Sequence, residues 1–200
     1  MVSHSYFFHG LEKTRYFSGY LLLIPDYYRG ISFDPASHAR QITLQFLSDQ
    51  SRWDNNGQLF QDYSIVKSYA KDTLGCKTIG VIGTCWGTYA VLRMSEDVDI
   101  KAAVSMHPSH PSVLSILGET EETCLKDIKC PQLYLPSKGD ADSVKKDGLS
   151  KQILGDALEI VEFPDMKHGW TIRGDLNQKN VDRDVKKAFN LVLSFFKKYL

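Results

Sequence analysis

The chain has 200 residues, of which 42% are hydrophobic, and its 24 Lys and Arg residues balance 24 Asp and Glu residues. This length predicts one domain, residues 1–200, that can bury a core without disulfides or a bound metal ion. A net charge of 0 provides no field that would concentrate the chain on nucleic acid or an anionic membrane, so neither is expected as a partner. Because the chain has no long apolar run and no recognisable export signal, we expect a cytoplasmic protein with reduced cysteines.

Short apolar runs alternate with amphipathic segments along the chain, which is typical of a parallel sheet covered by helices. Most of these runs are continuous, as expected of strands buried on both faces. Strands are predicted at residues 5–8, 20–25, 77–83, 102–106, 132–136 and 158–163. Loops are predicted at 31–41 and 52–58, where Pro, Gly, Asn and Asp gather. Helical spacing relates Leu59, Tyr63, Val66 and Ala70, and later Val185, Ala188, Phe189, Val192, Phe195 and Tyr199.

The segment Gly83-Thr84-Cys85-Trp86-Gly87 has the form G-x-nucleophile-x-G, between a predicted strand and a predicted helix. In such a sharp turn the chain crowds against itself, so only glycines are expected to fit on either side of the nucleophile. The start of a helix favours a thiolate, and the Trp86 N–H can donate to an oxyanion. Free cysteines are also often buried, however, so this motif alone leaves Cys85 as either a nucleophile or a small residue in a packed turn.

An acid and a histidine follow in the chain order that a catalytic triad of this type requires. Asp140 and Asp142 come just after the predicted strand 132–136, and His168 follows strand 158–163. Ligand sites of open α/β sheets lie at these carboxyl ends. Asp140 is preferred because it follows the strand more closely, but Asp142 could play the same part. Either could instead be a turn or N-cap residue of a helix expected near Ser143.

Together with GYLLLIPDYYRG, SMHPSHP and FPDMKHGWTIRGDL, this elbow resembles the dienelactone hydrolases (carboxymethylenebutenolidases), a branch of the α/β-hydrolase fold with a cysteine nucleophile. The resemblance covers most of the chain from about Gly19 onward. It implies a mostly parallel sheet with helices on both faces, and a chain that needs no metal or organic cofactor. It also implies Cys85 as nucleophile, Asp140 as orienting acid, His168 as base and Trp86 as an oxyanion donor.

The first residues depart from the family pattern, which begins with further strands and a longer helix. The segment SYFFHGL is expected to replace one of these strands and its loop, which makes the Phe8 N–H the second oxyanion donor. An acidic residue that controls the thiol in the family is missing, and Phe7 is near its place. Absent strands would expose a sheet edge, which favours pairing with another chain, as in a homodimer.

The dienelactone substrates of the family carry a carboxylate, for which an Arg fork is better suited than Lys. Arg29 and Arg173 are the candidates, and His107 is expected in the pocket wall. Metal sites at His107 with His110 or at Cys124 with Cys130 are disfavoured, because a structural zinc site needs four well-spaced ligands.

The resulting prediction is a hydrolase of an ester or lactone that forms a thioester on Cys85. One alternative is a weak or inactive family member that acts as a binding or interaction protein, which the altered N-terminal part favours. The other is a redox-sensitive thiol protein, for which no resolving cysteine is close to Cys85 in the sequence.

Overall fold

The computed structural model of the protein describes residues 15–17, 19–27, 45, 48–49 and 51–200. The chain divides into two compact units, residues 1–77 and 78–200. The predicted strand at 5–8 and the predicted loop at 31–41 lie outside the described residues. The expectation of a single domain stays a prediction.

The first unit contains a two-stranded antiparallel sheet of β1 (Arg15–Phe17) and β2 (Tyr20–Leu22). β2 begins where the sequence predicts, but it ends at Leu22 and pairs with β1 in antiparallel register, with Phe17 opposite Tyr20. The predicted strand is therefore confirmed in part, and its antiparallel partner β1 was not among the predicted strands. The link between the two strands is very short, and Gly19 has a φ of 89°. β1 and β2 therefore form a β-hairpin.

Helix α2 (Gln58–Ser68) and a π-helical turn (Tyr69–Thr73) complete the described part of this unit. The predicted helical spacing is confirmed, since Leu59, Tyr63 and Ala70 are buried. Before the helix, the Trp53 ring packs edge-on against Phe60, with 5.4 Å between the ring centroids.

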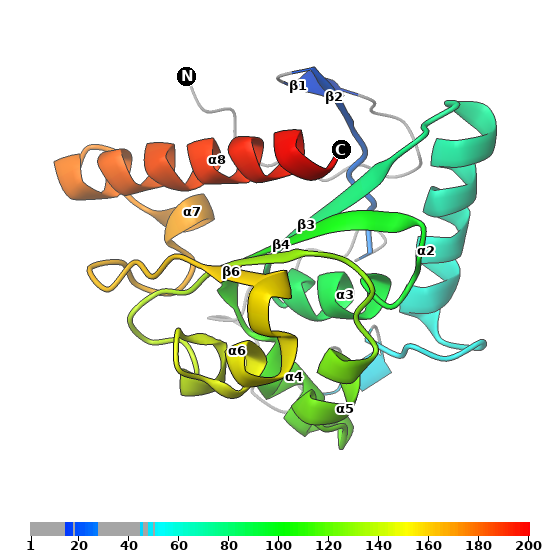
Figure 1. Cartoon of the computed structure of the whole chain (residues 1–200), viewed down its shortest axis with the longest axis horizontal. Coiled ribbons are helices and arrows are strands. Elements are labelled where there is room, and N and C mark those ends of the chain that lie inside the picture. The colour runs from blue at the N-terminus through cyan, green and yellow to red at the C-terminus, as the bar shows by residue number, and fades with distance from the viewer. Residues whose placement is uncertain (1–14, 18, 28–44, 46–47, 50) are drawn as a thin grey trace. The chain divides into compact units, whose positions relative to one another are not determined.

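The second unit is built on a parallel four-stranded sheet in the order β3-β4-β5-β6 (Figure 1). The strands are β3 (Ile79–Cys85), β4 (Ile100–Pro108), β5 (Gln132–Leu135) and β6 (Leu158–Ile160). Each lies within or overlaps a predicted strand, and the parallel sheet is confirmed. β4 lies between β3 and β5, and Lys101 is its one residue that is not buried, as expected of a strand covered on both faces.

Helices cover both faces of this sheet. Figure 1 shows α8 on one face and α3, α4, α5 and α6 on the other. The helices are α3 (Gly87–Met94), α4 (His110–Leu117), α5 (Glu121–Lys126), α6 (Leu149–Leu154), α7 (Trp170–Arg173) and α8 (Lys179–Tyr199). The helix expected near Ser143 is a single 3-10 turn at Asp142–Val144, and α6 begins six residues after Ser143.

The apolar face of α8 supplies much of the core. Val181, Ala188, Val192 and Phe195 pack in one cluster with β4 and β5 side chains such as Val104 and Leu135. Phe189, which was expected on this face, is 36% exposed. It lies about 100° around the helix from Ala188, so α8 cannot turn both residues toward the sheet.

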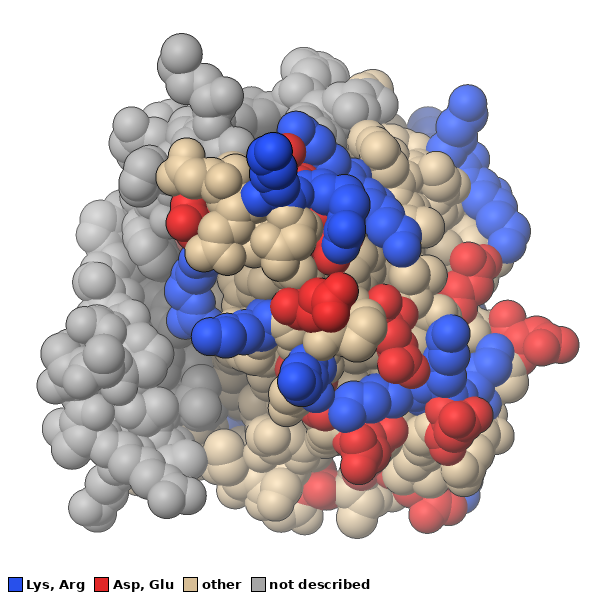
Figure 2. Space-filling model, turned by 90° about the vertical axis from the view of Figure 1, so that its left-hand side faces the viewer, with Lys and Arg blue, Asp and Glu red and all other residues tan. Residues whose placement is uncertain are grey.

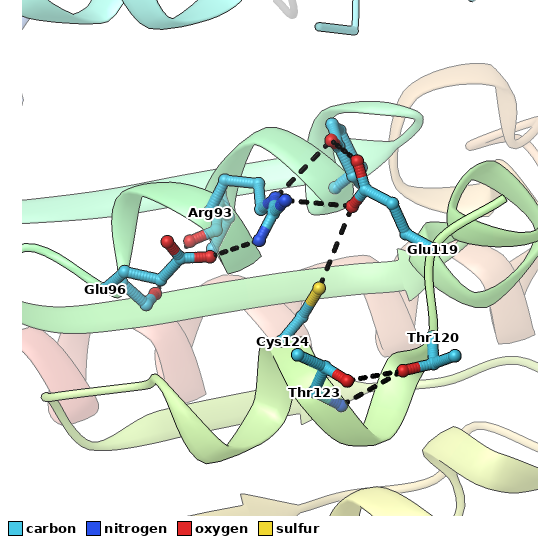
Figure 3. Close-up of polar contacts among 9 residues, drawn as sticks. Arg93, Glu96, Glu119, Thr120, Thr123 and Cys124 are labelled. Atoms are coloured by element: carbon cyan, nitrogen blue, oxygen red, sulfur yellow. Dashed lines mark hydrogen bonds and ion pairs between the residues drawn. The ribbon is translucent and has the colours of Figure 1, made fainter. Parts of the chain in front are cut away.

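A partly buried ion-pair cluster joins α3 to the segment before α5 (Figure 3). The Arg93 guanidinium contacts Glu96 at 2.6 Å and Glu119 at 2.9 Å. Glu119 also accepts a hydrogen bond from the Cys124 thiol, at 3.8 Å. Burial, with the nearby glutamates, raises the pKa of Cys124 to about 11, although Arg93 opposes this. Cys124 is therefore a packed, protonated residue of this cluster.

Positive and negative side chains are interspersed on the surface. Figure 2 shows Lys and Arg next to Asp and Glu across the described part of one face. Along α8, ion pairs join Lys186 to Asp182 and Arg183 to Asp184. Among the described residues, no helix is both long and apolar enough to cross a membrane.

Candidate active site

Cys85 is the last residue of β3 and stands at the turn into α3. Its φ of 54° lies in the left-handed region, which a non-glycine residue rarely adopts and which is common at functional turns. A Cβ added to Gly83 would lie 2.3 Å from the carbonyl oxygen of Gly87, so only glycine fits there, as predicted. At Gly87 an added Cβ would meet no described atom within 4 Å. The steric reason expected for the second glycine was therefore wrong for the part of the chain that the structure describes.

The carboxylate of Asp140 lies against the imidazole of His168. The Asp140 Oδ1 to His168 Nδ1 distance is 2.6 Å, and the Asp140 side chain is 1% exposed. Its other oxygen, Oδ2, accepts a hydrogen bond of 2.6 Å from the backbone N–H of Ser137. The carboxylate is therefore held from both sides, by the end of β5 and by the imidazole.

Two backbone contacts explain why these residues meet although they are far apart in sequence. Ser137 and Phe163 form a parallel bridge beyond the ends of β5 and β6. The Lys138 N–H then donates to the Met166 carbonyl, at 3.1 Å. These contacts hold the Asp140 loop and the His168 loop side by side at the carboxyl end of the sheet, where ligand sites of such folds lie.

Asp142, the alternative acid, has different surroundings. Its side chain is 98% exposed and pairs with Lys145 at 2.7 Å. That contact lowers the pKa of Asp142 through the hydrogen bond and charge of Lys145. The geometry therefore brings Asp140, and not Asp142, to His168.

Ser109 is a polar residue of this site that the sequence analysis did not single out. Its hydroxyl lies 3.7 Å from Cys85 Sγ and 3.3 Å from His168 Nε2. Ser109 follows β4 directly, within the segment MHPSHP. Its place at the carboxyl end of a strand is the feature of the sequence that could have identified it as a site residue.

The pKa values of Cys85 and His168 move in opposite directions. Burial alone would raise the pKa of Cys85, but hydrogen bonds from His168 and Ser109, the His168 charge and the Trp86 N–H together lower it. The hydrogen bond to Asp140, with the Cys85 contact, raises the pKa of His168 to about 9. Both shifts favour a thiolate next to an imidazolium. In contrast, burial raises the pKa of Cys130.

His107 is fully buried beside His168. The two rings meet edge to face, with 4.9 Å between their centroids, and His107 Nε2 is 2.7 Å from the Thr171 hydroxyl. Burial, with the His168 charge, lowers the pKa of His107 to about 4, so this ring is neutral at pH 7. His107 therefore packs against His168 in the protein interior. Its part in the wall of a substrate pocket stays a prediction.

Arg173 is exposed and lies close to the histidine loop. A Cβ added to Gly169 would fall 2.4 Å from Arg173 Nη2, so the guanidinium folds back over the residue that follows His168. Gly169 also has a φ of 86°, which favours glycine for a second reason.

The other predicted site residues, Phe8 and Arg29, lie outside the described residues, as does Phe7. Within the described ranges, no three His, Cys, Asp or Glu side chains are grouped so that they could hold a metal ion.

The sequence profile of the dienelactone hydrolase family matches residues 13–200. The chain belongs to this family. It is 29% identical over 129 residues to the hydrolase tropI of Talaromyces stipitatus, a match that covers 62% of this chain and 47% of that protein. It is 23% identical over 204 residues to the human carboxymethylenebutenolidase homolog, covering 95% of this chain and 78% of the relative.

A solved structure supports the fold of this dienelactone hydrolase family chain. The acylaminoacyl peptidase of Pyrococcus horikoshii superposes with a TM-score of 0.56 at 16% identity, covering 82% of this chain and 30% of the peptidase. With the parallel sheet and its two helical layers, this likeness shows the predicted α/β-hydrolase fold. The chain spans about half the length of tropI, so it corresponds to part of that hydrolase.

Proposed function

We propose that the protein hydrolyses an ester or lactone, with Cys85 as nucleophile, His168 as general base and acid, and Asp140 as the group that orients His168. The observation that carries this proposal is the continuous contact from the buried Asp140 carboxylate through His168 to the Ser109 hydroxyl and the Cys85 sulfur. Membership of a family with hydrolase relatives supports it.

The reaction has two balanced steps. In the first, the Cys85 thiolate attacks the carbonyl carbon, and the protonated His168 gives its proton to the leaving alkoxide oxygen, which leaves a thioester on Cys85. In the second, neutral His168 takes a proton from water as the water attacks the thioester, and the thiolate leaves. Asp140 stabilises the imidazolium present before and after the two steps.

The oxyanion of each tetrahedral intermediate needs hydrogen-bond donors. The Trp86 N–H, at the start of α3, contributes to the lowered pKa of Cys85, so it lies close to the reacting centre. The Phe8 N–H is proposed as the second donor from the sequence alone.

A substrate with a carboxylate close to the scissile carbonyl fits the surroundings best. Arg173, held over Gly169 next to His168, presents a fork of donors that suits a carboxylate. Arg29 is proposed as a second such residue from its place in the sequence. The proposed substrate class is thus an ester or lactone that carries a carboxylate.

A burst experiment with p-nitrophenyl acetate tests this function. Because the first step releases nitrophenol and leaves an acyl group on Cys85, we expect a burst of one equivalent and an acetyl adduct on Cys85 by mass spectrometry. Cys85→Ala should abolish the burst, and His168→Gln should slow it about 100-fold or more.

Cys76→Ala is the matched control, because Cys76 is also a partly exposed free thiol but lies before β3. It should keep the full burst. An undiminished burst in Cys85→Ala, or none in the wild-type protein, would contradict the proposed function.

A further inference from the structure

Ser109 stands where a helix-capping serine is expected, yet its hydroxyl is not used for capping. It is the N-cap residue of α4, and its side chain makes no capping hydrogen bond. An N-cap serine usually accepts a hydrogen bond from an amide of the first helical turn. Here the hydroxyl lies instead at 3.7 Å from Cys85 Sγ and 3.3 Å from His168 Nε2.

The buried Thr88 fixes the position of this hydroxyl relative to Cys85. The Thr88 hydroxyl donates to the Cys85 carbonyl at 2.7 Å. It also accepts from the N–H groups of Ser109 at 3.0 Å and His110 at 3.2 Å. One side chain of α3 therefore joins the turn at the end of β3 to the turn at the end of β4, and Ser109 cannot move far from the sulfur without breaking these contacts.

We propose that Ser109 is a further residue of the reaction centre, whose hydroxyl bridges the Cys85 thiolate and the His168 imidazolium and stabilises this pair at rest. The inference rests on the proposed function for its role in turnover. In the charged state, the Ser109 O–H donates to the thiolate, and the His168 Nε2–H, which also approaches the sulfur, lies within hydrogen-bond reach of the Ser109 oxygen. In the neutral state the thiol donates to Ser109, and Ser109 donates to Nε2. The hydroxyl therefore has a partner on each side whichever group holds the proton.

The charged and titratable groups around this bridge come from several elements. Asp140, from the loop after β5, lies on the far side of His168, and Arg173 of α7 folds over Gly169. The His107 ring of β4 packs against His168 and is neutral at pH 7. Removal of the Ser109 hydroxyl leaves all of these groups in place, so a change in the titration of Cys85 would report the hydroxyl itself.

The test is the pH dependence of iodoacetamide alkylation of the full chain, measured by mass spectrometry on the peptide that contains Cys85. Since a hydrogen bond to a charged group is among the stronger ones, Ser109→Ala should raise the apparent pKa of Cys85 by about one unit. Ser109→Thr keeps the hydroxyl and should stay near the wild-type value. Ser112→Ala, an exposed serine on the same helix, is the control and should change nothing.

The same samples, tested with p-nitrophenyl acetate, separate this inference from the proposed function. A raised pKa in Ser109→Ala supports the bridge, even if the wild-type protein shows no burst and the hydrolase assignment fails. An apparent pKa of Cys85 that does not rise in Ser109→Ala, in protein with wild-type circular dichroism, overturns the bridge even if the burst is present.

Discussion

Asp140 and Asp142 are two residues apart, yet their surroundings differ sharply. The Asp140 carboxylate is buried between the Ser137 amide and His168, whereas Asp142 is exposed and pairs with Lys145. A buried charge that is hydrogen-bonded on both oxygens interacts strongly, because little water screens it. The same type of side chain therefore has a large electrostatic effect at one position and a small one at the other.

This contrast gives a prediction at the scale of one residue. Asp140→Asn replaces the carboxylate whose hydrogen bond is the main cause of the raised pKa of His168, so the pKa should fall from about 9 toward its ordinary value. Ester hydrolysis should fall by about 10³- to 10⁴-fold, the size of effect seen when a triad acid becomes an amide. NMR titration of the imidazole and aryl-ester kinetics measure the two effects.

Asp142→Asn is the control for this change, because it alters an exposed ion pair that contributes little. It should leave both the His168 titration and the rate of hydrolysis at their wild-type values. Equal losses in the two variants would show that Asp140 does not act through His168.

At the scale of the element, α8 binds the sheet through a narrow line of side chains. Phe195 is 4% exposed and packs on Tyr199, with 4.9 Å between the ring centroids. Phe189, on the same helix, is 36% exposed. Burial provides most of what an aromatic ring contributes to stability, so the buried Phe195 should stabilise the fold more than the partly exposed Phe189.

We therefore expect Phe195→Ala to lower the free energy of unfolding by about 3–5 kcal/mol, through lost burial and the cavity that remains. Phe189→Ala should cost less than about 1 kcal/mol. Urea unfolding followed by circular dichroism measures both. A larger loss for Phe189→Ala would mean that α8 is rotated relative to the sheet from the position described.

At the scale of the whole molecule, the net charge determines how strongly two copies of the protein repel each other. The chain carries 24 basic and 24 acidic residues, and its net charge is 0 at pH 7. Without net charge, repulsion between copies is weak, and association and precipitation are favoured. The homodimer stays a prediction. A net charge of 0 would favour it, because the repulsion between two copies is weak.

Solubility should therefore be lowest near pH 7. Below about pH 6.5 histidines gain positive charge, although His107, whose pKa is about 4, stays neutral until more acidic pH. The concentration of polyethylene glycol that precipitates the protein should then be higher at pH 5.5 than at pH 7. A lower concentration at pH 5.5, with the protein still folded, would contradict this expectation.

The sequence by itself determined the parallel sheet of the second unit, the turn at Cys85 and the places of Asp140 and His168 at strand ends. These follow from local properties, namely apolar runs, glycine spacing and chain order. Local patterns did not predict the hairpin pairing of β2, because the partner strand β1 is only three residues long and has no clear apolar signal.

Only the tertiary structure decided which acid meets His168, that His107 is buried behind it, and that Ser109 lies between His168 and Cys85. Each of these depends on contacts between residues 24 to 64 positions apart. Such contacts are set by the register of neighbouring parallel strands and by the turns beyond their ends, where a shift of one residue reverses the direction of a side chain. The order of the strands and loops along the chain places the candidate residues at one edge of the sheet. Contacts between the loops decide which of these residues meet.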